Sequence, residues 1–215
     1  PLTRMASGDS CSDSHLVGVP ERIHAVRPDA RFIYIVRAPV TRTYSSYWHA
    51  VRYGYKDRGF RKALEEAPGF LDTSDYAGQL DAYLRCFPPE SFLLIPFEEM
   101  KLDPVVAAQR CFAFLGVEPG GFTPEFERAK NVSFRYNGFA RLVRSVMPSG
   151  DAMNRLVNIG QALTPGPLQP FAKRLITNEI PPLSDEDRAF LIRYFRPRNA
   201  RLSEMLNVST ADWQH

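Results

Sequence analysis

An arginine and a serine in the segment 37–47 have side chains that could bind a phosphate group. Arg37 directly follows the apolar run 32–36, and Ser45 lies eight positions further along the chain. A guanidinium pairs with two phosphate oxygens at once, and a serine hydroxyl adds another donor, so the pair could form a phosphate clamp. Taken alone, an arginine after a strand is more often a solvated charge, and a serine in the first turns of a helix is more often a cap. Both interpretations stay open on these two residues.

The elements around this pair favour an anion site. The run Phe32-Ile33-Tyr34-Ile35-Val36 is β-branched and aromatic throughout, which is typical of a central parallel strand that is covered on both faces. Residues 41–53 read as a helix, with Pro39 near its start. In open α/β sheets ligands bind beyond the carboxyl ends of the strands, where helix N-termini offer free N–H groups. The sequence therefore places the arginine and the serine where such a ligand would bind.

The rest of the chain predicts an α/β fold in three layers, with a parallel sheet flanked by helices. Asp103 is a helix cap before Pro104, and Gly116 ends the same helix. Ser184-Asp185-Glu186-Asp187 opens the last helix with a capping-box pattern. The other expected elements are helices at 20–26 and 75–87 and a second buried strand at 92–95.

Composition excludes several classes of protein. The 215 residues suit one domain, and the net charge of +3 with a pI of 8.9 fits a small anionic ligand rather than nucleic acid. No apolar run approaches the roughly 18 residues of a membrane span. The three cysteines show no paired spacing, which argues against a disulfide framework and against a zinc site.

The segment from Arg37 to Tyr47 reads Arg-x-Pro-x-x-Arg-x-Tyr-Ser-x-Tyr. It resembles the 3′-phosphate-binding motif of sulfotransferases that use 3′-phosphoadenosine-5′-phosphosulfate (PAPS), with Ala38 where the family usually has Asp or Asn. The resemblance continues through 76–100, through the Phe-Leu-Gly stop at 114–116 and, more loosely, through 183–213, and it favours the bacterial and heparan-sulfate-type branch.

This resemblance implies an enzyme that transfers a sulfuryl group from PAPS to a hydroxyl or amine, on a small molecule or a saccharide, without a metal. Arg37 and Ser45 would bind the 3′-phosphate, and Tyr76 and Arg135 are further candidates for contact with the nucleotide. The implied fold is the P-loop-NTPase-like sulfotransferase fold, and the chain as given is expected to lack its first strand. The expected compartment is a bacterial cytoplasm, with the Golgi lumen as the alternative.

The resemblance also implies how one domain spanning 1–215 is organised. Residues 1–19 are irregular, 20–116 form the nucleotide-binding core, 117–182 are an irregular or helical acceptor and cover region, and 183–215 form the C-terminal helices.

The family's other nucleotide-binding loop, similar to Pro-Lys-x-Gly-Thr-Thr, has no counterpart in these residues. Asp9, in Gly8-Asp9-Ser10, loosely matches a family stretch that supplies the catalytic base, although an exposed aspartate is the commoner interpretation. His49, one turn after Ser45, is a weaker candidate. An alternative is therefore an incomplete homologue that only binds adenosine 3′,5′-bisphosphate (PAP). A P-loop kinase would need a Gly-rich loop ending in Lys-Ser/Thr, which is absent from the sequence.

Overall fold

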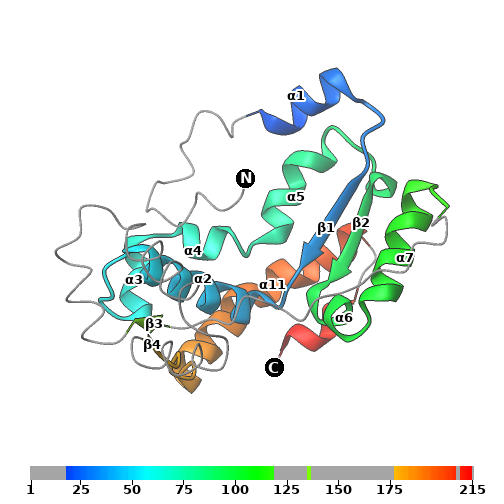
Figure 1. Ribbon diagram of the computed structural model, residues 1–215. Coiled ribbons are helices and arrows are strands. Elements are labelled where there is room, and N and C mark those ends of the chain that lie inside the picture. The colour runs from blue at the N-terminus through cyan, green and yellow to red at the C-terminus, as the bar shows by residue number, and fades with distance from the viewer. Residues whose placement is uncertain (1–17, 119–134, 137–176, 207–208, 215) are drawn as a thin grey trace, which may run out of the picture.

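The computed structural model describes residues 18–118, 135–136, 177–206 and 209–214 (Figure 1). Its helices are α1 (Val19–Val26), α2 (Pro39–Tyr53), α3 (Phe60–Glu66), α4 (Gly69–Asp72), α5 (Tyr76–Leu84), α6 (Phe97–Leu102), α7 (Pro104–Leu115) and α11 (Asp185–Leu206), with 3-10 turns η2 (Pro89–Ser91) and η4 (Ala211–Gln214). Its strands are β1 (Phe32–Val36), β2 (Phe92–Pro96), β3 (Arg135–Tyr136) and β4 (Thr177–Asn178). In this part of the chain no helix is long and apolar enough to cross a membrane.

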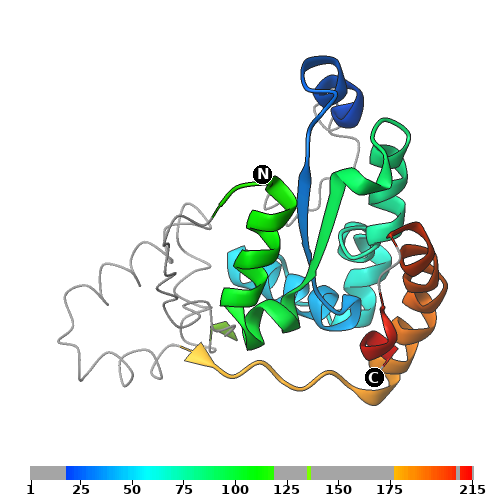
Figure 2. The same ribbon diagram turned by 90° about the vertical axis from the view of Figure 1, so that its right-hand side faces the viewer.

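The centre of the fold is a parallel pair of strands. β1 pairs with β2 in a register that runs from Phe32 opposite Phe92 to Val36 opposite Pro96. Helices α6 and α7 lie on one side of the pair and α5 and α11 on the other (Figure 2). The predicted α/β architecture, a parallel sheet flanked by helices, is confirmed. Both strands end at the same edge of the sheet, where α2 and α6 begin.

The two faces of β1 differ in burial. Tyr34 and Val36 pack with Leu94 against α5, α11 and Trp213. On the other face Ile33 is 40% exposed and Ile35 is 49% exposed. The sequence predicted a strand covered on both faces, and within the described residues only one face of β1 is covered. That the chain lacks the first strand of the fold stays a prediction.

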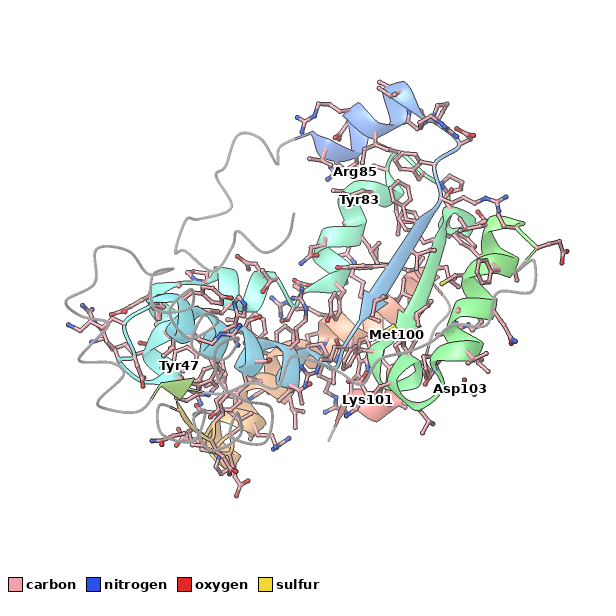
Figure 3. All side chains as sticks on the ribbon, viewed as in Figure 1. Tyr47, Tyr83, Arg85, Met100, Lys101 and Asp103 are labelled. Carbon is pink, nitrogen blue, oxygen red and sulfur yellow. The ribbon has the colours of Figure 1, made fainter. Side chains whose placement is uncertain are left out.

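A second core lies where α2, α3, α4 and α11 meet. Leu191 and Phe195 of α11 are almost fully buried against Tyr47 and Trp48 of α2. Figure 3 shows Tyr47 at the α2–α3 end of the molecule, far from Tyr83. This core fixes the helix that carries Ser45.

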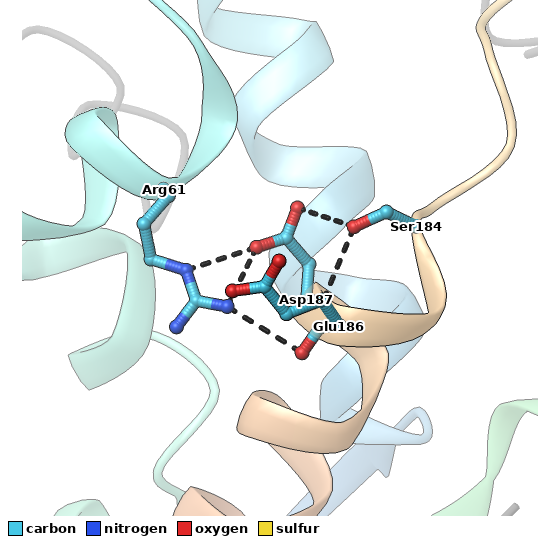
Figure 4. Close-up of polar contacts among 4 residues, drawn as sticks. All are labelled: Arg61, Ser184, Glu186 and Asp187. Atoms are coloured by element: carbon cyan, nitrogen blue, oxygen red, sulfur yellow. Dashed lines mark hydrogen bonds and ion pairs between the residues drawn. The ribbon is translucent and has the colours of Figure 1, made fainter.

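The start of α11 is tied to α3 by a polar cluster (Figure 4). The Ser184 hydroxyl accepts from the Asp187 amide at 3.1 Å and donates to the Asp187 carboxylate at 2.8 Å, which confirms the predicted cap. Arg61 donates from Nε to the other carboxylate oxygen of Asp187 at 2.9 Å, and its guanidinium lies 4.0 Å from the centre of the Phe190 ring. The cluster orients α11 against the helices that follow α2.

The predicted limits of α7 are confirmed. The Asp103 carboxylate accepts from the amides of Val105 and Val106 at 3.1 and 3.0 Å (Figure 3). Gly116 ends the helix in the left-handed conformation, with φ 70°.

Replacing Asp103 with alanine should remove the cap and lower the free energy of unfolding by about 0.5–2 kcal/mol. Urea unfolding followed by circular dichroism measures the change. Asp103→Ser is the control, because a serine hydroxyl can accept the same bonds. An equal loss in both variants would contradict the role of the cap.

Candidate functional site

Arg37 is the first residue after β1, at the edge of the sheet where both strands end. Its guanidinium lies over the ring of Phe97, with 5.6 Å from Cζ to the ring centre. Among the described residues this guanidinium has no hydrogen-bond or ion-pair partner. An arginine held by an aromatic face keeps its five N–H donors available for an anion.

Ser45 lies on α2, about two turns from its start, and is half-buried. Its hydroxyl has no hydrogen-bond partner within the described part of the chain. The structure therefore leaves both predicted phosphate ligands without a competing polar partner there. It places Ser45 on the helix that begins two residues after Arg37.

The start of α2 lacks a capping side chain, because Ala38 occupies the N-cap position. The Ala38 amide instead donates to the Glu98 carboxylate at 3.4 Å, and the Thr41 hydroxyl donates to the Ala38 carbonyl at 2.9 Å. Glu98 comes from α6, directly after β2. This contact does not replace a cap, because a capping Asp or Asn would accept from the amides of the first helical turn rather than from the amide of the N-cap residue.

Tyr76 is 2% exposed and contacts Arg37 directly. Its hydroxyl accepts from the Arg37 amide at 3.0 Å and donates to the Arg37 carbonyl at 2.9 Å. Burial raises the pKa of Tyr76, so the hydroxyl stays protonated at neutral pH. A direct contact between Tyr76 and a nucleotide remains a prediction, and the contact that the structure describes is with the Arg37 backbone.

Arg42, the second arginine of the motif, has a different environment from Arg37. It donates to the Thr73 carbonyl, and its Cζ lies 5.4 Å from the centre of the Tyr76 ring. Its donors are partly used within the protein, so Arg42 supports the fold around Tyr76, whereas the donors of Arg37 have no partner among the residues that the structure describes.

His49 is one turn beyond Ser45 and exposed. Desolvation and the nearby Arg52 lower the pKa of His49, so the imidazole is neutral at pH 7. Its ring lies 4.6 Å from that of Tyr53, centre to centre.

The structure does not describe the side chains of two other predicted site residues. Asp9 lies outside the described residues. Arg135 lies in β3, which contacts α2, while its side chain is outside what the structure describes. Their roles as base and as nucleotide ligand stay predictions.

Sequence reasoning gave no role to Phe97 and Glu98, which contact Arg37 and Ala38. A usable signal was present, because both residues directly follow an apolar strand predicted to be parallel to the first. The ends of adjacent parallel strands meet at one edge of a sheet. In the described ranges no three His, Cys, Asp or Glu side chains gather as a metal site would require.

Three features of this region favour negative charge: the Arg37 guanidinium and the Ser45 hydroxyl, neither with a hydrogen-bond partner among the described residues, and the amino-terminal end of α2, where the Glu98 carboxylate lies against the Ala38 amide. That Arg37 and Ser45 bind one anion together stays a prediction.

Comparisons with known proteins identify relatives of this chain. Heparan sulfate glucosamine 3-O-sulfotransferase 6 of Homo sapiens is 36% identical over 107 residues, which are 46% of this chain and 31% of that protein. The bifunctional heparan sulfate N-deacetylase/N-sulfotransferase 3 of Mus musculus is 25% identical over 210 residues, 90% of this chain and 21% of that protein. The chain thus spans less than a third of the length of either relative.

A solved structure supports the fold. The crystal structure of a sulfotransferase from Alicyclobacillus acidocaldarius matches with a TM-score of 0.61 at 24% identity, over 92% of this chain and 63% of that one. A profile of the sulfotransferase family matches residues 13–121, slightly more than half of the 215 residues. The chain belongs to the sulfotransferase family.

Proposed function

We propose that this chain carries the part of a sulfotransferase that binds the 3′-phosphate of PAPS. The observation that supports the proposal is Arg37, the first residue after β1 at the carboxyl edge of the sheet, whose guanidinium has no hydrogen-bond or ion-pair partner among the described residues. Ser45, on the helix that follows, likewise has no hydrogen-bond partner in that part of the chain. The positions of both residues match the family motif.

The reaction moves a sulfuryl group from PAPS to an acceptor. The bond between sulfur and the bridging phosphate oxygen breaks, a bond forms between sulfur and the acceptor oxygen or nitrogen, and PAP leaves. A base takes the acceptor's proton, as in phosphoryl transfer, and Asp9 is our candidate for it. Arg37 and Ser45 hold the donor by a phosphate remote from the reacting atoms, which orients the sulfuryl group.

The acceptor we propose is a saccharide hydroxyl or amine. One relative is named as a 3-O-sulfotransferase and another as an N-sulfotransferase, both of heparan sulfate. Sulfuryl transfer from radiolabelled PAPS to a panel of saccharides, catalysed by the full-length gene product, tests the proposal. We expect labelled product with at least one acceptor. No product with any acceptor, together with no binding of PAPS, would overturn the proposal.

A second candidate is a homologue that binds PAP without turnover. Binding of PAP with no labelled product in the same assay would support this candidate instead.

Ser45→Ala should weaken PAP binding by about threefold to tenfold, because one hydrogen bond to a charged phosphate is lost. Calorimetry measures the affinity. Ser46→Ala is the matched control, since the next residue points about 100° away around the helix. Equal effects from the two serines would contradict a specific role for Ser45.

A further inference from the structure

The chain leaves the β1–β2 pair at Arg37, the residue whose side chain we propose to bind the phosphate. Arg37 is the first residue after β1, and its N–H and C=O are both bonded by one group, the Tyr76 hydroxyl, at 3.0 and 2.9 Å. One hydroxyl that donates and accepts on the same residue fixes the orientation of that residue's backbone.

Tyr76 is itself held on several sides. Its ring meets Tyr34 edge-on with centres 5.6 Å apart, lies 5.9 Å from the ring of Trp213, and is covered by the Arg42 guanidinium. Because the ring is 2% exposed and packed by three elements, the hydroxyl has little freedom to follow a moving Arg37.

The start of α5 is fixed as well. Asp75, the residue before Tyr76, accepts from the Gly78 amide at 3.0 Å and pairs with Arg198 of α11 at 3.0 Å. The position of Tyr76 therefore depends on α5, α11 and α2 together.

The Arg37 guanidinium, by contrast, makes no hydrogen bond or ion pair with the described residues, and it lies over the face of Phe97. A face contact leaves the guanidinium free to slide and turn more than a pair of directed hydrogen bonds would. Bidentate pairing with phosphate is sensitive to displacements of the order of 0.5 Å. The position of the Arg37 guanidinium must therefore be fixed through the Arg37 backbone.

We infer that Tyr76 is a positioning residue for the 3′-phosphate: its hydroxyl holds the Arg37 backbone so that the guanidinium meets the phosphate. The inference rests on the proposed function. It gives Tyr76 a part in selecting nucleotides that carry a 3′-phosphate, without contact between Tyr76 and the ligand.

Tyr76→Phe tests the inference, because it removes the hydroxyl and keeps the ring. The full-length gene product and its variants are titrated with PAP and with adenosine 5′-monophosphate (AMP), which lacks the 3′-phosphate. We expect PAP affinity to fall about threefold to tenfold while AMP affinity stays the same, so that the preference for PAP shrinks.

Tyr34→Phe is the matched control. The Tyr34 hydroxyl donates to Gln79 at 2.7 Å in the same core and does not contact Arg37. We expect it to leave the preference for PAP over AMP unchanged. Urea unfolding of both variants reports how much stability each hydroxyl contributes.

An unchanged PAP preference in Tyr76→Phe would overturn the inference, and so would an equal loss of PAP and AMP affinity. Arg37→Ala separates this failure from failure of the proposed function. If Arg37→Ala also leaves PAP binding intact, the phosphate site itself is wrong. If only Arg37→Ala weakens PAP binding, the phosphate site stands and the positioning role of Tyr76 fails.

The double variant is an independent test. In the Arg37→Ala background, Tyr76→Phe should have no further effect on the preference for PAP over AMP, and a full additive effect would overturn the inference.

Discussion

Replacing Arg37 with alanine should weaken PAP binding by about 10- to 150-fold. This corresponds to roughly 1.5–3 kcal/mol, the usual contribution of a hydrogen bond to a charged group. The effect is expected to be large because the guanidinium has no other polar partner in the described residues, so nothing within them competes with phosphate. Isothermal titration calorimetry with PAP measures it.

Two controls make this prediction specific. Arg31→Ala removes an arginine just before β1, at the far end of the strand, whose guanidinium donates to the Phe114 carbonyl, and should leave PAP affinity unchanged. AMP binding should be the same in wild type and in Arg37→Ala. The PAP affinity of Arg37→Lys should fall between those of wild type and Arg37→Ala, because an ammonium keeps the charge and loses the planar fork. A loss of AMP affinity as large as that of PAP would contradict a contact with the 3′-phosphate.

Leu191→Ala should lower the free energy of unfolding by about 2–5 kcal/mol. Leu191 is 0% exposed and packs in the core where α11 meets α2, α3 and α4. The substitution removes buried methyl groups and leaves a cavity that the surrounding helices fill only in part. Urea unfolding followed by circular dichroism gives the change.

The control for this prediction is Leu102→Ala, the same substitution at a residue that is 89% exposed. Its effect should stay within about 0.5 kcal/mol of zero. Similar losses in the two variants would contradict the assignment of the second core. Folded Leu191→Ala protein should still bind PAP, since Leu191 packs in the core between α11 and α2 and is not one of the proposed phosphate ligands.

Local signals in the sequence predicted much of the fold. Asp103 and Gly116 were identified as the limits of α7, and Ser184 as the cap of α11, because each acts on a backbone only a few residues away. Helices α3 and α4 were missed because they have 7 and 4 residues, too few for a helical period to be recognised. Helix α6 was missed because it follows β2 without a connecting loop.

The candidate site was predictable only in part. The order of residues around Arg37 and Ser45 indicated a strand followed by a helix, and therefore a place for an anion. The hydroxyl that holds the Arg37 backbone lies 39 residues further along the chain, and no local pattern reports such a contact. The exposure of Ile33 and Ile35 was also not predictable, because it depends on what lies over the sheet rather than on the strand itself.

A crystal structure of the full-length protein bound to PAP would test the central claim most directly. We predict that nitrogen atoms of the Arg37 guanidinium and the oxygen of the Ser45 hydroxyl each lie about 2.7–3.2 Å from oxygens of the 3′-phosphate. A bound nucleotide whose 3′-phosphate contacts neither residue would contradict the account.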